Sequence, residues 1–389
     1  MTAKIGMGMG ALAILALAFI GWPASLFIDH DFVQYWLAGH ALLSAQDPYD
    51  PDLWRALHAH VGSNGSEIAP GAGFLYPAVT AVAVMPLSLL PFSLAAAAWF
   101  VASVASALVA LVALGRKLFT VRPRWDLAVL LLFAAVIRPD YLLPIDGNIT
   151  DFLVGIVGGA IALLLRGRAV AAGALLGLAI VKPHLLIVFV PSLLLFVEAR
   201  ERVRLLTGAL LTAATLLTIS LALAPAWPLE WARQSLRIGN YARTNLWGIM
   251  PADSPWLAAM VAIGLVLGLV AWWRVTRPSL AVACGASIAV SLLLAPYAFM
   301  IDQAVLLVSV AAIVGLVQDL PPLSRNVILL IVVALASPWY MGALIGLVPI
   351  NVLRLAPVLV VLAVTILMQA YLRWSVRAPA AVFASAPGS

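Results

Sequence analysis

The segment after the first apolar stretch gathers acidic and aromatic side chains and holds the strongest candidate for chemistry, Asp31. Apolar residues over positions 32–43 recur at helical spacing, which predicts a short interfacial helix with Asp31 at its start. An ionised carboxylate at this position could take a proton from a substrate hydroxyl. Asp31 with Gln34 also fits a capping box, which needs no catalytic role. Asp29 and His30 are expected to be solvated loop residues.

A lysine at the end of an apolar stretch, Lys182, is followed by Pro183 and His184. A lipid phosphate at headgroup depth needs a cation, and Lys182 could supply it. A lysine that only snorkels to the interface would give the same pattern. His184 is a second candidate for the phosphate, although it also suits a local hydrogen bond. No partner histidine stands at metal-ligand spacing, so we predict no structural metal, while a loosely held divalent ion beside a phosphate stays open.

Two more polar groups lie beside apolar stretches. Tyr241 and Arg243 combine a ring and a guanidinium in one loop, which suits a sugar and a phosphate. Interfacial aromatic residues and arginines are nevertheless common in any membrane protein. Asp302 and Gln303 open a later apolar stretch, where a carboxylate is expensive unless it faces a cavity or caps a helix.

The composition decides which solvent surrounds these residues. Of the 389 residues, 64% are hydrophobic and 10% are charged, which excludes an ordinary soluble globule. Long stretches lack Asp, Glu, Lys and Arg and do not alternate, so they predict membrane helices and not a barrel. The single cysteine, Cys284, excludes an intrachain disulfide. The net charge is +6, and the basic residues that cause it lie in short loops. This distribution indicates membrane topology and not nucleic-acid binding.

The loops alternate in character and predict the topology. Short basic loops, near residues 116–124, 166–168, 200–204, 274–277 and 373–377, are expected in the cytoplasm by the positive-inside rule. Longer loops rich in Asp, Trp, Tyr and Pro, above all residues 29–75 and 225–254, are expected outside. We therefore predict a single integral membrane domain over residues 1–389, all-α and polytopic, with about 10–13 transmembrane helices.

The stretch from Ile68 to Gly115 is the weak point of this topology, because it is long enough for two helices. Three prolines break its first half. We predict one full span from about Phe92 to Leu114, preceded by a shallow or re-entrant helix near residues 76–90. The opening stretch, residues 5–28, is expected to be a retained first helix.

Short motifs in a fixed order resemble glycosyltransferase family 87. They are Asp31-Phe32, Tyr35-Trp36, Asp47-Pro48-Tyr49, Tyr76-Pro77, Gly147-Asn148, Lys182-Pro183 and Pro296-Tyr297 before Asp302. The resemblance implies a GT-C-type fold and transfer of a sugar from a polyprenyl phosphate, as in the family's mannosyltransferases. It also implies that Asp31 is the general base. Tyr35 and Asn148 become candidates for substrate contact, although family members often carry Gly-Gln in place of Gly147-Asn148.

These observations lead to one expected function and two rivals. We expect an inverting glycosyltransferase that moves mannose or a related sugar from a polyprenyl-phosphate donor to a lipid or glycan acceptor. Its active site would face the periplasm or exterior of a bacterial inner (plasma) membrane, with no cofactor. The rivals are a polytopic transporter or lipid/polyprenyl flippase, which broken helices would also suit, and a non-catalytic scaffold.

Overall fold

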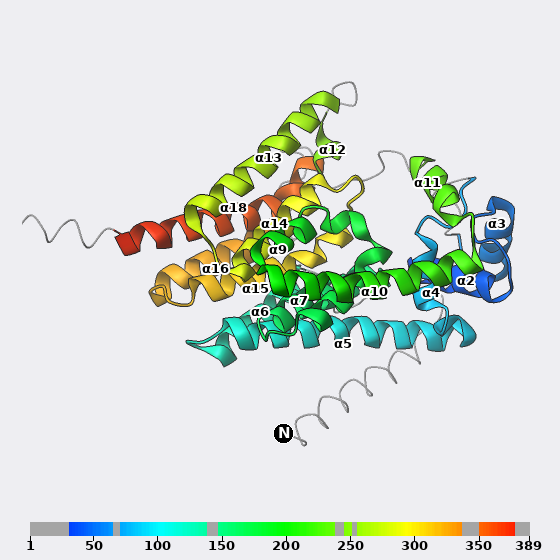
Figure 1. The fold of residues 1–389 in the computed structure, drawn as a ribbon, viewed down its shortest axis with the longest axis horizontal. Helices are drawn as coiled ribbons and strands as arrows, with labels where there is room; N and C mark the ends of the chain where they lie inside the picture. Colours follow the sequence, from blue (N-terminus) through cyan, green and yellow to red (C-terminus); the bar gives the residue numbers. More distant parts are fainter. Residues whose placement is uncertain are drawn as a thin grey trace, which may run out of the picture. The chain divides into compact units, whose positions relative to one another are not determined.

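The computed structural model describes residues 31–64, 71–137, 147–237, 245–250, 255–336 and 350–377 (Figure 1). All regular elements in these ranges are helical, which confirms the all-α fold class. In chain order they are α2 (Asp31–Leu43), α3 (Pro51–His60), α4 (Ala78–Val84), η3 (Leu87–Leu89), α5 (Phe92–Leu118), α6 (Pro123–Ile137), α7 (Thr150–Leu164), α8 (Ala169–Leu178), η5 (Ala179–Val181), η6 (Pro183–Leu186), α9 (Phe189–Phe196), α10 (Ala199–Leu223), α11 (Trp227–Arg237), α12 (Leu246–Ile249), α13 (Pro255–Thr276), α14 (Leu280–Leu294), η7 (Met300–Val305), α15 (Leu306–Val317), α16 (Pro322–Ala336) and α18 (Ile350–Arg377). The helix expected at residues 5–28 lies outside the described residues.

Five described helical segments are long and apolar enough to cross a bilayer: Phe92–Leu118, Ala199–Leu223, Trp256–Thr276, Met300–Val317 and Leu353–Trp374. Shorter apolar helices accompany them, among them α7, α8 and α14. α10 exposes large apolar side chains such as Leu210 and Leu211, which water would disfavour and lipid accepts. The protein is therefore a multi-pass integral membrane protein, and the long apolar helix predicted from Phe92 is confirmed as α5.

The described helices form two compact units. Unit 1 comprises residues 1–110, 139–183 and 200–241, and unit 2 comprises residues 111–138, 184–199 and 242–389. α5 begins in unit 1 and ends in unit 2. The prediction of one membrane domain over the whole chain stays a prediction, and each unit is described separately.

In unit 1, the helix predicted after Asp31 is present as α2, but it is buried on most sides. α2 packs against α4 and η3, and Ser88 donates a hydrogen bond to the carbonyl of Trp36 (2.9 Å). The Trp36 indole in turn donates to the carbonyl of Leu90 (3.2 Å). α2 is thus held more firmly than an amphipathic helix with one face in solvent.

The broken helix predicted before α5 is also present. α4 ends at Val84, and η3 follows directly after Pro86, which cannot donate a hydrogen bond to the preceding turn. The Thr80 hydroxyl donates to the carbonyl of Val181 (3.2 Å), so α4 is fixed against the residue that precedes Lys182. This short helix therefore connects α2 to the end of η5.

Small residues bring the longer helices of unit 1 together. A side chain at Gly173 or Gly177 of α8 would collide with the backbone of α10, and one at Gly208 of α10 would collide with α8. Close backbone contact of this kind is how helices associate in lipid, where hydrophobic burial gives little driving force. α8 and α10 are therefore in close backbone contact, and α7 in turn packs against α8.

Unit 2 is built around α14, whose residues from Ala281 to Leu293 are all buried. α14 packs against α9, α13, α15 and α18. Ser291 accepts hydrogen bonds from the backbone N–H groups of Val188 and Phe189 (3.0 and 2.8 Å), which fixes the start of α9. Ser309 of α15 donates to the carbonyl of Gly285 (2.9 Å). The Ser291 hydroxyl thus satisfies N–H groups at a helix start that lipid could not, and the Ser309 hydroxyl connects α15 to α14.

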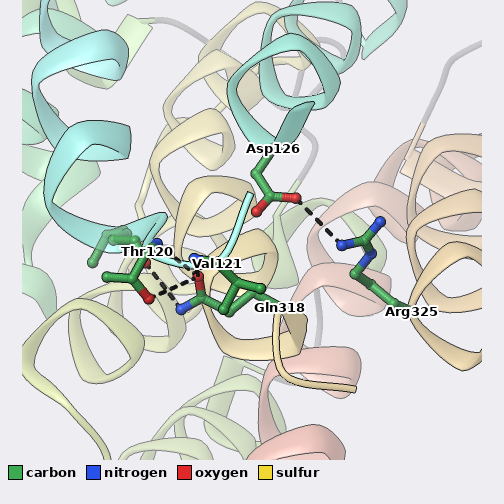
Figure 2. Close-up of polar contacts among 6 residues, drawn as sticks. Thr120, Val121, Asp126, Gln318 and Arg325 are labelled. Carbon is green, nitrogen blue, oxygen red and sulfur yellow. Dashed lines mark hydrogen bonds and ion pairs between the residues drawn. The ribbon is translucent and has the colours of Figure 1, made fainter. Parts of the chain in front are cut away.

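Figure 2 shows two polar links around the turn from α5 to α6 in unit 2. The Gln318 amide accepts from the backbone N–H groups of Thr120 and Val121 (2.9 and 3.3 Å) and donates to a carbonyl at the end of α5. Asp126 in the first turn of α6 faces Arg325 of α16 at 3.7 Å, and both side chains are buried. These links fix the α5–α6 turn to α15 and α16.

Candidate active site

The site in unit 1 begins with the backbone at Gly147. This residue has a φ of +58°, in the left-handed region that glycine adopts without strain. A Cβ atom here would lie 2.6 Å from the Cβ of Phe32, so only glycine allows the two segments to approach. The Trp99 indole donates to the carbonyl of Gly147 (2.8 Å). These contacts place the next residue, Asn148, beside the start of α2.

The amide of Asn148 has a fixed orientation. Its Oδ1 accepts from the backbone N–H and the hydroxyl of Thr150 (2.9 and 2.6 Å) and from the Lys182 ammonium (3.2 Å). Because three donors face this atom, it must be the oxygen, and the Nδ2 group faces the other way. That group donates a hydrogen bond to Oδ2 of Asp31.

Asp31 is therefore held by residues from other elements. In addition to Asn148, the Tyr76 hydroxyl donates to its Oδ1 at 3.3 Å. The carboxylate is only half-buried, whereas Asn148 and Lys182 are almost fully buried. A carboxylate that is positioned by two donors and still partly open can accept a proton from a bound hydroxyl group.

The motif Asp47-Pro48-Tyr49 holds Tyr76 in place. The Tyr49 hydroxyl donates to the carbonyl of Tyr76 (2.7 Å), and the Asp47 carboxylate accepts from the backbone N–H of Tyr49 (3.0 Å). Gly73 lies directly against the backbone of Tyr49, at a distance that excludes a side chain. The part of the first loop that follows α2 thus supports one of the two donors to Asp31.

Helix α11 of the second predicted outward loop also packs on this loop. The Gln234 amide donates to the carbonyl of Tyr49, and the Trp231 indole donates to the carbonyl of Leu75, both at 3.2 Å. The two loops predicted to face outward therefore meet within unit 1. Their contact stabilises the segment that carries Tyr76.

Lys182 brings a positive charge into this cluster. It follows η5, and its ammonium donates to Thr150 Oγ1 (3.1 Å) as well as to Asn148. The ammonium also lies 5.8 Å from the centre of the Tyr76 ring, within the range of a cation–π contact. Lys182 is 4% exposed, so it is a buried member of the site and not a lysine that snorkels to the interface.

Tyr35 supports the site from behind. Its side chain is fully buried and meets the Tyr76 ring edge-on, with 4.9 Å between ring centres. Burial, together with the neighbouring Tyr76 and Asp31, raises the pKa of Tyr35 well above its usual value. Tyr35 therefore stays neutral, and in this structure it contacts Tyr76 from the protein interior.

The structure thus brings together four of the predicted residues, namely Asp31, Asn148 and Lys182, with Tyr35 packed behind them. His184 belongs to η6 of unit 2 and is half-exposed. Asp302 and Gln303 also belong to unit 2, in η7, where Asp302 accepts from the backbone N–H of Phe299 (2.9 Å) as a helix cap would. The other two candidates, Tyr241 and Arg243, lie outside the described residues.

The sequence matches the profile of glycosyltransferase family 87 over residues 74–309, more than half of the chain. The chain belongs to glycosyltransferase family 87. Searches of curated proteins and of solved structures found no match. The protein is therefore a membrane glycosyltransferase, and this identification sets aside the transporter, flippase and scaffold hypotheses.

The matched region of this family 87 enzyme contains Tyr76, Asn148 and Lys182 but begins after Asp31. The geometry therefore adds something that the match does not, because it connects Asp31 to residues inside the matched region. The Gly-Asn motif, where family members often carry Gly-Gln, still presents an amide to the carboxylate. No group of three or more potential metal ligands occurs in the described ranges, and the prediction of no metal cofactor stays a prediction.

Two residues of the cluster were not predicted as site residues. Thr150 contacts both Asn148 and Lys182, and Tyr76 contacts Asp31. Tyr76 stands in one of the motifs that carry the resemblance, which was a usable signal. The only signal for Thr150 was its position two residues after Asn148. An asparagine side chain often accepts hydrogen bonds from a residue two positions later at a helix start.

Proposed function

We propose that this enzyme transfers mannose or a related sugar from a polyprenyl-phosphate donor to a hydroxyl group of a lipid or glycan acceptor, with inversion. The observation that carries the proposal is the hydrogen-bonded chain from Lys182 through Asn148 to Asp31. It ends in a half-buried carboxylate that is positioned to accept a proton. The choice of donor and sugar is supported by the family resemblance.

In the proposed reaction, the acceptor hydroxyl attacks the anomeric carbon from the face opposite to the phosphate. A bond forms between the acceptor oxygen and this carbon while the bond from the carbon to the phosphate oxygen breaks. Asp31 takes the hydroxyl proton, and the polyprenyl phosphate leaves with the bonding electrons. Inversion follows from this single displacement.

Lys182 and Tyr76 have supporting roles in this proposal. The charge of Lys182 keeps Asn148 turned toward Asp31, and it is available to offset negative charge that develops on the departing phosphate. The Tyr76 hydroxyl holds the second oxygen of Asp31. The phosphate contacts predicted at His184 and Arg243 stay predictions.

The decisive test is sugar transfer by purified protein from a radiolabelled synthetic polyprenyl-phosphate mannose. Asp31→Asn keeps the size of the side chain but removes the base, so transfer should fall by about a hundredfold or more. Asp52→Asn, a change of an exposed carboxylate on α3, is the matched control and should transfer normally. Turnover of Asp31→Asn close to that of the wild type would exclude Asp31 as the base.

We also propose that the site faces the periplasm or exterior. This can be tested with single cysteines in a Cys284→Ala background, since Cys284 is buried. A membrane-impermeant maleimide should label Ser44→Cys in intact cells and should not label Arg168→Cys, both at exposed positions. The reverse pattern would put the Asp31 loop inside the cell and refute this part of the proposal.

A further inference from the structure

The last described helix of unit 2, α18, carries arginines near both ends of its apolar stretch. At about 1.5 Å per residue, the stretch from Arg354 to Arg373 is about 28 Å long. The hydrocarbon core of a bilayer is about 30 Å thick. When Arg373 lies at the headgroup level of one leaflet, Arg354 lies at the headgroup level of the other. The positive-inside rule places the basic segment 373–377 in the cytoplasm, so Arg354, at the other end of the helix, is assigned to the outward end.

The backbone of Arg354 is held in place by a neighbouring element. Its carbonyl accepts a hydrogen bond of 2.6 Å from the amide of Gln303, which is 5% exposed. Pro357 follows in the first turns of α18 and lacks an N–H group, so this part of the helix has one backbone donor fewer than a regular helix. η7 packs against α18 and, through Gln303, supplies a side-chain donor to it.

The side chain of Arg354 is in a different situation. It is half-buried, and its Nε–H group is buried and has no hydrogen-bond acceptor among the described residues. Arg325 also has a buried Nε without an acceptor, but it faces Asp126, whereas no described carboxylate lies within ion-pair distance of Arg354. Asp302 in η7 accepts from the backbone of Phe299.

An arginine in this state is expensive, because its guanidinium stays charged and a buried donor without an acceptor costs free energy. At headgroup depth, the abundant anion that can satisfy a guanidinium is a lipid phosphate. Its oxygens match the planar fork of an arginine.

The elements beside Arg354 are fixed by side-chain donors. Asn245, the N-cap of α12, and Trp247 within α12 donate to the carbonyls of Ala295 and Leu294 at the end of α14 (2.8 and 3.0 Å). α12 packs against both α14 and α18. These bonds satisfy carbonyls that have no partner within the helix at the end of α14. This end of unit 2 is therefore preformed and does not need a ligand to order it.

We propose that Arg354 binds the phosphate group of a membrane lipid at the outward end of unit 2. The ligand chemistry is a phosphate mono- or diester on a hydrophobic tail, which both a polyprenyl phosphate and an anionic phospholipid provide. The inference rests on the proposed function only where the lipid is taken to be the polyprenyl substrate. It assigns Arg354 a role in binding and not in proton transfer.

The test measures binding of two probes to the full-length protein in nanodiscs of phosphatidylcholine. The probes are undecaprenyl monophosphate and phosphatidylglycerol, with bound lipid counted by native mass spectrometry. Arg354→Gln should weaken binding of at least one probe by about ten- to a hundredfold. Arg373→Gln, at the other end of the same helix, is the matched control, because its guanidinium already donates to the carbonyl of Arg277.

The two probes separate the sources of the phosphate. A loss confined to undecaprenyl phosphate identifies a substrate site, and a loss confined to phosphatidylglycerol identifies a site for bulk lipid. Unchanged binding of both probes by a folded Arg354→Gln protein would overturn the inference. Should that variant not fold, phenylglyoxal labelling of the wild type replaces it. Undecaprenyl phosphate or phosphatidylglycerol should then protect Arg354 and not Arg373, and equal labelling with and without lipid would refute the site.

This experiment also keeps the two proposals apart, because it does not require turnover. Binding that depends on Arg354 in a protein that transfers no sugar would refute the proposed function alone. Normal sugar transfer with binding that ignores Arg354 would refute the further inference alone.

Discussion

Both units contain a buried cation near a carboxylate, and the two arrangements differ in how the groups are joined. In unit 1, Asp31 is half-buried and receives hydrogen bonds from Tyr76 and Asn148, while Lys182 acts through Asn148. In unit 2, Asp126 is fully buried and faces Arg325 directly at 3.7 Å (Figure 2).

The hydrogen bonds decide what each carboxylate can do. Neither oxygen of Asp126 has a hydrogen-bond partner among the described residues, so its negative charge is offset by the charges of Arg325 and, to a smaller extent, Arg122. Burial raises the pKa of Asp126, while Arg325 and then Arg122 lower it. A fully buried ion pair of this kind, here called the sealed pair of Asp126 and Arg325, holds helices together. A half-buried carboxylate that is held by hydrogen-bond donors, such as Asp31, is suited to a proton transfer.

The same substitution at both carboxylates should separate these roles most clearly. Asp31→Asn should reduce sugar transfer by about a hundredfold or more and leave the thermal unfolding temperature nearly unchanged. Asp126→Asn should leave transfer near normal but lower the unfolding temperature, because Arg325 keeps its charge without a partner. Turnover and thermal unfolding measured on both purified variants check the comparison. Loss of transfer in both, without loss of stability in either, would contradict it.

Breaking the sealed pair from the other side should give the largest loss of stability. Arg325→Met leaves the Asp126 carboxylate unpaired and should cost about 3–5 kcal/mol at neutral pH. Without Arg325, the pKa of Asp126 rises further, so the loss should shrink as the pH falls and the carboxylate becomes protonated. Denaturation at several pH values measures this dependence. The double variant Asp126→Leu/Arg325→Met, which removes both charges, should recover most of the stability, and a larger loss in the double variant would argue against a simple ion pair.

A smaller effect is expected at the amide that connects Lys182 to Asp31. Asn148→Ala removes a donor to the carboxylate and should lower kcat by about tenfold, with little change in KM for the donor. Asn148→Gln keeps an amide, as in many members of the family, and should retain more activity than Asn148→Ala. Steady-state kinetics of the wild type and both variants measure these differences. A kcat of Asn148→Ala equal to that of the wild type would show that the amide does not position Asp31.

The sequence determined the solvent, the secondary structure and the order of the motifs. Long stretches without charge can only be helical in lipid, so the all-α fold and the span from Phe92 followed from composition. Prolines marked the break before α5, and the motifs indicated the family and named Asp31, Asn148 and Lys182 individually. These features depend on local chemistry, which a linear pattern records.

Only the tertiary structure decided which of these residues meet. Asn148 lies far from Asp31 in the sequence, and its role depends on the left-handed turn at Gly147 and its contact with Phe32. The burial of α2, the pairing of Asp126 with Arg325 and the burial of the Arg354 Nε–H away from any described acceptor also depend on contacts between distant segments. A polar residue beside an apolar stretch has the same local pattern whether it caps a helix, pairs with a charge or faces a ligand, so its partners can be identified only in the folded chain.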